Sequence, residues 1–225
     1  WEMQKQISKK ILVYFFLLIV VSSINNNSFN NLKLSQIQNI NISGLDQKDN
    51  EILLDKVKNL TEKNIFFINK NEIIKLIESN SLVEKYEVFI RYPSTINIDI
   101  EKTNFFAKIN KNGKTFLIGS NGKLTPAEDF NYELPYIFGK LNINEFLKFK
   151  QIIDKSKFNY KQIDNLYFFP SNRWDIKLKE DILLKLPINF TVKKLNHLYE
   201  FLENNNEKNF VVVDYRVENQ IILNE

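Results

Sequence analysis

The chain has 225 residues, of which 44% are hydrophobic and 26% charged, proportions typical of a folded globular protein. It contains no cysteine, which excludes disulfide bridges, thiolate zinc sites and cysteine nucleophiles. The net charge of +4 comes with only three arginines, and the lysines are scattered among carboxylates, so a nucleic-acid-binding face is not expected.

The first element predicted along the chain is a membrane anchor at 11–24, an uncharged apolar run that follows three lysines. By the positive-inside rule these lysines predict a cytoplasmic tail at 1–10, which we expect to be incomplete because Trp1 is not an initiator residue. The 14-residue run spans only about 21 Å as a helix, against about 30 Å of hydrocarbon. A cleaved signal peptide is therefore a second interpretation. Both interpretations export the rest of the chain, which begins with a polar linker at 25–33.

The next segment, 34–102, has the predicted order strand, helix, helix, strand, strand. Its clearest signal is a pair of runs with period-2 alternation, at 86–91 and 96–101, joined by a turn that contains Pro93. The preceding patterns predict one strand and two helices. The strand is expected over 36–43, one helix after Asp46 and the other over 70–79.

From residue 103 onward the pattern changes to short strands and tight turns. The pairs Asn112–Gly113 and Asn121–Gly122 predict turns with positive φ angles, the first in a β-hairpin. Amphipathic patterns predict two helices, one over 144–157 and one that includes Val192 to Leu202. The segment 103–225 is therefore predicted as a mostly antiparallel β domain with two helices. Its later strands are expected near 162–169, 173–178, 182–185, 210–215 and 220–223.

Several of these segments resemble, in order, the FtsQ/DivIB family of bacterial cell-division proteins. They are an Arg-x-Pro hairpin at Arg91 followed by a strand ending in Glu101, the two Asn-Gly turns, the Leu-Pro-Tyr-Ile-Phe-Gly segment at 134–139, the Arg-Trp-Asp strand at 173–175 and the closing Asp-Tyr-Arg at 214–216. The resemblance implies an α+β fold with a single N-terminal membrane anchor. It implies a βααββ POTRA domain at 34–102 and an FtsQ-type β domain at 103–225.

The resemblance also implies a function, that of a non-enzymatic scaffold of the divisome that links early and late division proteins at the septum. Such a protein is a single-pass protein of the cytoplasmic (inner) membrane, with the N-terminus inside and the C-terminal domains in the periplasm. The implied partners are division membrane proteins of the FtsB and FtsL type and septal wall synthases, bound partly by β-strand addition. No cofactor, small-molecule substrate or nucleic acid is implied.

The terminal strands are the first predicted partner surface. An uncovered edge of the predicted strand at 220–223 offers main-chain groups to an incoming strand. The resemblance implies this use for the terminal strands, where Asp214 and Arg216 match the family's Asp-x-Arg and are expected to position or pair with a partner. Tyr215, Val217 and Ile222 either pack inward or line the partner groove, according to a strand parity that the sequence leaves open. For Asp214 and Arg216, an ordinary ion pair across the sheet is an equally good interpretation.

A second predicted partner surface is an edge of the POTRA sheet. Because POTRA edge strands also bind partners, the resemblance nominates the strand that carries Ile96, Ile98 and Glu101. Arg91 and Pro93 are instead predicted to shape the hairpin.

The sequence shows no constellation of catalytic residues. His197 is the only histidine and is predicted to be an ordinary, partly exposed residue, and no Gly-x-Ser-x-Gly elbow or glycine-rich phosphate loop is present. Carboxylate pairs such as Glu128–Asp129 and Glu180–Asp181 leave an exported glycan hydrolase as a competing hypothesis. A cell-wall glycan-binding protein and a POTRA-type outer-membrane assembly factor are two further hypotheses. No catalytic, cofactor-binding or metal-binding residue is predicted.

Overall fold

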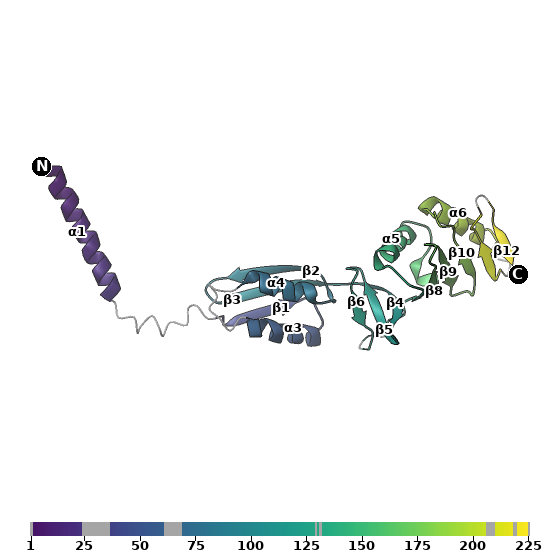
Figure 1. Cartoon of the computed structure of the whole chain (residues 1–225), viewed down its shortest axis with the longest axis horizontal. Helices are drawn as coiled ribbons and strands as arrows, with labels where there is room; N and C mark the ends of the chain where they lie inside the picture. The colour runs from purple at the N-terminus through teal and green to yellow at the C-terminus, as the bar shows by residue number, and fades with distance from the viewer. Residues whose placement is uncertain are drawn as a thin grey trace. The chain divides into compact units, whose positions relative to one another are not determined.

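The computed structural model describes residues 2–23, 37–60, 69–128, 130, 132–205, 210–217 and 220–224 (Figure 1). The chain divides into two compact units. One comprises residues 1–76 and 87–99, and the other comprises residues 77–86 and 100–225.

The N-terminal apolar run lies in helix α1 (Glu2–Ser23). Its apolar side chains from Ile11 to Val21 are exposed. Within the described ranges, however, no helix is both long and apolar enough to cross a membrane. The transmembrane anchor predicted at 11–24 is therefore a helix through residue 23 but is not confirmed as a membrane span. The linker predicted at 25–33 lies outside the described residues.

A three-stranded sheet with two helices follows α1 (Figure 1). Its strand order is β1-β3-β2. The bounds of its elements are β1 (Asn39–Ser43), α3 (Gln47–Leu60), α4 (Lys70–Ser79), β2 (Val83–Arg91) and β3 (Thr95–Lys102). β1 runs parallel to β3, with Ile40 opposite Ile96 and Ile42 opposite Ile98. The predicted order of strand, helix, helix, strand, strand is confirmed.

Burial in this first part follows the two periodicities of the sequence. Along β3, Ile96 and Ile98 are fully buried, because alternate residues of a strand point to the same face. On the helices, the buried residues recur at intervals of about four, as one face of a helix requires. They include Leu53 and Val57 on α3 and Ile73 on α4.

The second part is built on a nine-stranded sheet in the order β12-β11-β10-β9-β8-β7-β4-β5-β6. Its strands are β4 (Phe105–Lys111), β5 (Lys114–Gly119), β6 (Leu124–Pro126), β7 (Tyr136–Phe138), β8 (Ile163–Phe168), β9 (Trp174–Leu178), β10 (Leu183–Lys185), β11 (Val212–Asp214) and β12 (Ile222–Asn224). Five of the pairings are antiparallel and three are parallel, namely β4 with β7, β7 with β8 and β10 with β11. The prediction of a mostly antiparallel sheet is confirmed, although the sequence did not reveal the parallel pairs.

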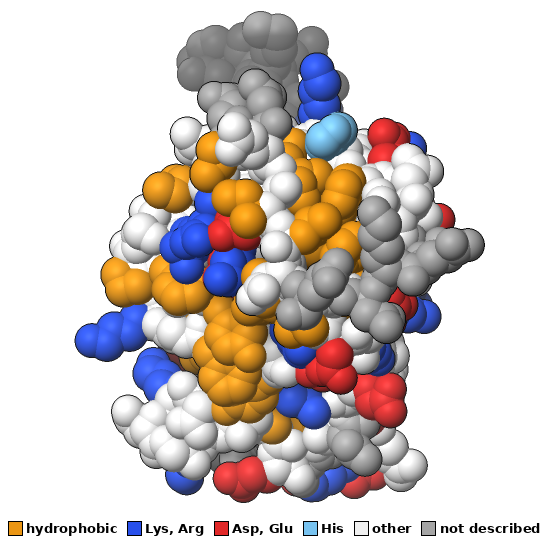
Figure 2. Space-filling model, turned by 90° about the vertical axis from the view of Figure 1, so that its right-hand side faces the viewer, with side chains coloured by type: hydrophobic (Ala, Val, Ile, Leu, Met, Phe, Trp, Pro, Cys, Tyr) orange, Lys and Arg blue, Asp and Glu red, His pale blue; other side chains and the backbone are white. Residues whose placement is uncertain are grey.

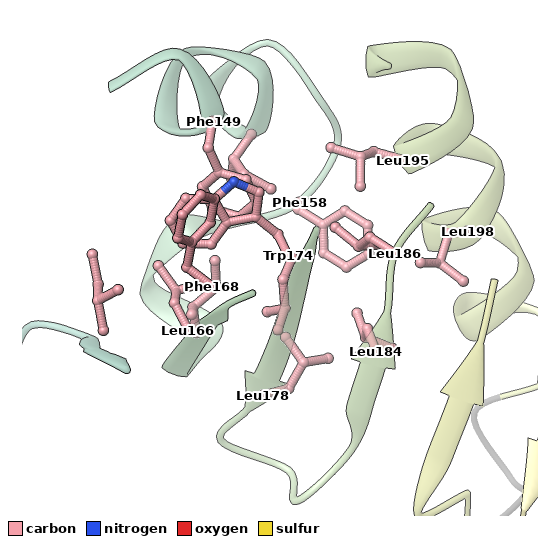
Figure 3. Packing of buried hydrophobic residues seen from close by; sticks show 14 of the residues in the cluster. Phe149, Phe158, Leu166, Phe168, Trp174, Leu178, Leu184, Leu186, Leu195 and Leu198 are labelled. Atoms are coloured by element: carbon pink, nitrogen blue, oxygen red, sulfur yellow. The ribbon is translucent and has the colours of Figure 1, made fainter. Parts of the chain in front are cut away.

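Two helices and a cluster of aromatic and aliphatic side chains build the core on one face of this sheet (Figure 3). The helices are α5 (Ile143–Asp154), capped by the Asn142 side chain, and α6 (Val192–Glu203), capped by the Thr191 side chain. Trp174 is 2% exposed and stacks on Phe149, with ring centroids 4.4 Å apart. Phe168 approaches the same indole at 4.8 Å. The candidate functional surface described below lies on the other face of this sheet, at its β12 edge and beside the N-terminal part of α6.

The turn after β5 fastens residues 78–84 within the second compact unit. The Asn121 side-chain amide donates to the carbonyl oxygens of Ser81 and Val83, both at 2.9 Å. The Ser120 hydroxyl donates to the Glu84 carboxylate at 2.6 Å. These half-buried bonds satisfy main-chain groups that would otherwise lose their partners on burial.

Candidate partner-binding surface at the C-terminal strands

The strand β12 is an edge of the nine-stranded sheet. Among the described residues it pairs with β11 alone, in antiparallel register, with Ile222 opposite Asp214 and Leu223 opposite Val213. Ile222 is 52% exposed and Leu223 is 38% exposed. Because consecutive strand residues point to opposite faces, this edge carries an exposed apolar side chain on each face. An edge with free main-chain groups and apolar flanks is a template for another strand.

The sheet face opposite α5 and α6 carries a row of side chains that the strand register aligns. The row runs from Phe138 through Tyr167 and Asp175 to Lys185, Asp214 and Ile222. The rings of Phe138 and Tyr167 stack at 5.2 Å. The row thus changes from aromatic to charged to aliphatic as it approaches the β12 edge.

The charged centre of this row holds two arginines in place. Arg173 Nε donates to Asp175 Oδ1 at 3.2 Å, and Arg216 Nε donates to Asp214 Oδ1 at 2.8 Å. Lys185 lies between the two aspartates in the register. Figure 2 shows basic and acidic side chains gathered beside hydrophobic ones on this end of the molecule.

The two aspartates have opposite pKa shifts. Burial raises the pKa of Asp175, which is 3% exposed, and the positive charge of Arg173 opposes that shift. The hydrogen bond from Arg216 lowers the pKa of Asp214, against a smaller opposing effect of burial. Asp214 therefore stays ionised well into the acidic range and keeps the Arg216 guanidinium oriented.

A cavity of about 960 Å³ lies next to this cluster. Its lining includes Arg173, Lys193, Lys194 and Arg216, and no carboxylate is among the described residues that line it. Cationic side chains in the wall of a concave site favour anionic side chains over cationic ones. The volume suits a few side chains of a partner.

The structure brings the five predicted C-terminal residues together but assigns them different roles. Asp214 and Arg216 form an ion pair between residues two apart in the chain, rather than across the sheet as predicted, and Val217 lines the cavity. Tyr215 is buried on the helix-bearing face, and its hydroxyl lies 3.2 Å from His197 Nδ1. The His197 side chain is thus part of the cavity wall, a role that the sequence did not reveal.

Three cationic residues of the cavity were not predicted as site residues from the sequence. Lys193 and Lys194 follow the helix cap Thr191, and Arg173 precedes the buried Trp174. A signal existed for Arg173, since it is one of only three arginines and two of them lie here. No sequence signal marked the two lysines, because lysine is common throughout the chain.

The prediction that the strand with Ile96, Ile98 and Glu101 is an edge of the POTRA sheet is wrong. β3 is the central strand of the three-stranded sheet, so its main-chain groups pair on both sides. Ile96 and Ile98 are 0% exposed and belong to the core. Glu101 is exposed, and it forms an ion pair with Lys85 at 2.9 Å. The sheet edges are β1 and β2, because β3 inserts between them.

The structure offers no metal centre in its described part, where no group of three His, Cys, Asp or Glu residues converges. Of the carboxylates named for a glycosidase, Asp129 lies outside the described residues. Glu180 and Asp181 lie in the exposed turn between β9 and β10, where Asp181 pairs with Lys177 at 3.0 Å.

The fold and the edge site define a protein with a POTRA domain followed by a β domain that presents a terminal strand. The family model for the FtsQ-type POTRA domain matches residues 35–102. The model for the C-terminal part of the cell division protein FtsQ/DivIB matches residues 101–216. The chain belongs to the FtsQ/DivIB family of cell division proteins.

Individual proteins are similar to parts of this chain. Cell division protein FtsQ of Rickettsia bellii is 24% identical over 198 residues, which cover 84% of this chain and 72% of that protein. Cell division protein DivIB of Staphylococcus aureus is 32% identical over 95 residues, which cover 40% of this chain but only 21% of that protein. The solved major extracytoplasmic domain of DivIB from Geobacillus stearothermophilus, in its trans isomer, matches with a TM-score of 0.34 and 12% identity. That match covers 48% of this chain and 97% of that chain.

Proposed function

We propose that this chain is a non-enzymatic scaffold of the divisome, which binds other division proteins at the septum through its C-terminal sheet edge. The observation that carries the proposal is the β12 edge, with exposed Ile222 and Leu223 on its two faces beside the cationic cavity. Membership of the FtsQ/DivIB family supports a role in division.

The proposed mechanism is strand addition. A partner strand aligns along β12 and forms main-chain hydrogen bonds, while its apolar side chains cover Ile222 and Leu223. Acidic side chains next to that strand enter the cavity and meet Arg173 and Arg216. The aspartates Asp175 and Asp214 hold these arginines in orientation before the partner arrives, which reduces the entropy lost on binding.

The proposed partners are membrane proteins of the FtsB and FtsL type, together with septal wall synthases. Helix α1 holds the chain at the cytoplasmic (inner) membrane, with the N-terminus inside and the remaining parts in the periplasm. A second partner contact is proposed at β2, the edge strand next to β3, where Phe89 is 46% exposed.

The test is purification of the tagged full-length protein from its own membranes in mild detergent, with mass spectrometry of the co-purifying proteins. We expect small membrane proteins with acidic exported segments. The substitution Ile222→Glu places a charge at the edge, and we expect it to reduce recovery of the C-terminal partner by about tenfold, equivalent to about 1.4 kcal/mol. Ile52→Glu changes an exposed isoleucine of α3 and serves as the control.

Recovery of outer-membrane assembly factors, or equal loss of partners with both variants, refutes the proposal. A partner that is lost with Ile222→Glu but retained with Ile52→Glu supports it, because both side chains are exposed to a similar extent.

A further inference from the structure

The two Asn-Gly pairs of the chain differ sharply in their surroundings. In an Asn-Gly pair, the backbone nitrogen that follows Asn is unusually free to approach the Asn side-chain carbonyl carbon, because glycine has no side chain to obstruct it. Asparagine is a chemically labile residue, and a following glycine removes one obstacle to its reaction. Whether the attack occurs in a folded protein depends on what restrains the side chain and the following nitrogen.

Asn112 is weakly restrained. It lies at the exposed tip of the β4–β5 hairpin with φ +55°. In the described part of the chain, its side-chain amide forms no hydrogen bond. No atom lies within 4 Å of the position that a Cβ of Gly113 would take. The attacking nitrogen is restrained by one side-chain contact among the described residues, in which the Gly113 N–H donates to Asn110 Oδ1 at 3.0 Å.

Asn121 is strongly restrained. Its Nδ2 donates to the carbonyl oxygens of Ser81 and Val83, and its Oδ1 accepts from the Lys123 N–H at 2.9 Å. The following Gly122 N–H donates to the Gly119 carbonyl at 3.0 Å. Attack on the Asn121 side chain requires the loss of all four hydrogen bonds.

We propose that Asn112 is a site of spontaneous deamidation in the folded protein and that the tertiary structure protects Asn121. The deprotonated backbone nitrogen of Gly113 attacks Asn112 Cγ, a new C–N bond closes a succinimide ring, and the side-chain nitrogen leaves as ammonia. Water then opens the ring at either carbonyl, which produces aspartate or isoaspartate. No oxidant or reductant takes part.

The product changes the hairpin in two ways. Each event adds one negative charge between Lys111 and Lys114, the last paired residues of β4 and β5. In the isoaspartate form the main chain passes through the former side-chain carbon, so the two-residue turn becomes longer by one atom. Deamidation at Asn112 does not involve the proposed partner surface, because the hairpin lies at neither the β12 edge nor the cationic cavity.

The expected difference between the deamidation rates of Asn112 and Asn121 follows from the number of hydrogen bonds that must break. Asn121 must break three more hydrogen bonds than Asn112. Each additional bond lowers the population of the open, reactive state by roughly a factor of five. We expect deamidation of Asn112 to be on the order of 100-fold faster than that of Asn121.

The experiment incubates the purified full-length protein in mildly alkaline buffer prepared with heavy-oxygen water. Cleavage after glutamate releases residues 102–128 as one peptide that contains both Asn-Gly pairs, and fragmentation assigns the mass gain to one position. The same incubation in concentrated urea provides the unfolded reference, in which we expect similar rates at the two sites. Gly113→Ala provides a chemical control, which we expect to slow the reaction at Asn112.

Preferential modification of Asn112 in the folded protein, with the preference lost in urea, supports the proposal. Equal rates at both positions without denaturant overturn it. So does an unmodified Asn112 after a time in which the urea sample has reacted.

Discussion

Gly139 provides the sharpest test of how the second part of the chain is packed. It follows β7 directly, with φ +117°, and a Cβ at this position would lie 2.1 Å from the carbonyl oxygen of Phe168. That oxygen belongs to the backbone of β8, the parallel neighbour of β7, so no side-chain rotation relieves the overlap. Phe168 in turn packs against Trp174 in the core.

The cost of Gly139→Ala has two parts. An L-residue at positive φ costs roughly 1–2 kcal/mol. Separating β7 from β8 is a form of overpacking, which typically costs about 1–3 kcal/mol. We expect a total of about 2–5 kcal/mol, a large share of the roughly 5–15 kcal/mol by which folded proteins are stable.

The control is Gly113→Ala in the β4–β5 turn. Gly113 has φ +78°, but nothing lies within 4 Å of its Cβ position, so this substitution carries backbone strain without overlap. We expect it to cost about 1–2 kcal/mol. The difference between the two variants isolates the contact with the Phe168 carbonyl.

The assay is urea unfolding followed by tryptophan fluorescence. The buried Trp174 reports on the core, and Trp1→Phe leaves it as the sole tryptophan. With a urea dependence of about 2 kcal/mol per molar, Gly139→Ala should lower the midpoint by about 1–2.5 M. Equal midpoints for the two glycine variants would refute the packing of β7 against β8.

Three further predictions use the same unfolding assay. Lys150 is buried and pairs with Asp154, and its Nζ lies 4.6 Å and 4.3 Å from the ring centroids of Phe106 and Tyr160. Lys150→Ala should therefore cost about 2–4 kcal/mol of stability, and Lys150→Met clearly less. Asn121→Ala removes three hydrogen bonds and should cost about 2–3 kcal/mol. Arg216 lowers the folded-state pKa of Asp214 below the ordinary 3.8, so its stabilisation is present above that pH and disappears as the pH falls through the folded pKa. Asp214→Asn should therefore be less stable than wild type at neutral pH, with the gap closing in acid.

Each of these predictions has an outcome that contradicts it. Equal stability of the methionine and alanine variants at Lys150 would mean that its buried stem contributes nothing. A neutral Asn121→Ala would mean that the half-buried carbonyls of Ser81 and Val83 find water instead. A gap between wild type and Asp214→Asn that is independent of pH would remove the Arg216 interaction as its cause.

The sequence alone determined the local elements, because their signals depend on neighbours within a few residues. Asn112 and Gly113 marked the β4–β5 turn, since both positions need positive φ angles, and the structure has φ +55° and +78° there. The period-2 isoleucines at 96 and 98 marked a strand with one buried face, and that face is fully buried. The order of the elements was also sufficient for the family resemblance.

Only the tertiary structure decided which strands are edges and which side chains meet. β3 became central because β1, far earlier in the chain, pairs with its free side, and no local pattern encodes that choice. The face of Tyr215 depended on the pairing of β11 with β10, since a shift of one residue would reverse it. Arg173 and Arg216 line one cavity because β10 inserts between β9 and β11. Pairing between distant segments is decided by the burial of the whole core, so these contacts follow from the fold rather than from any single segment.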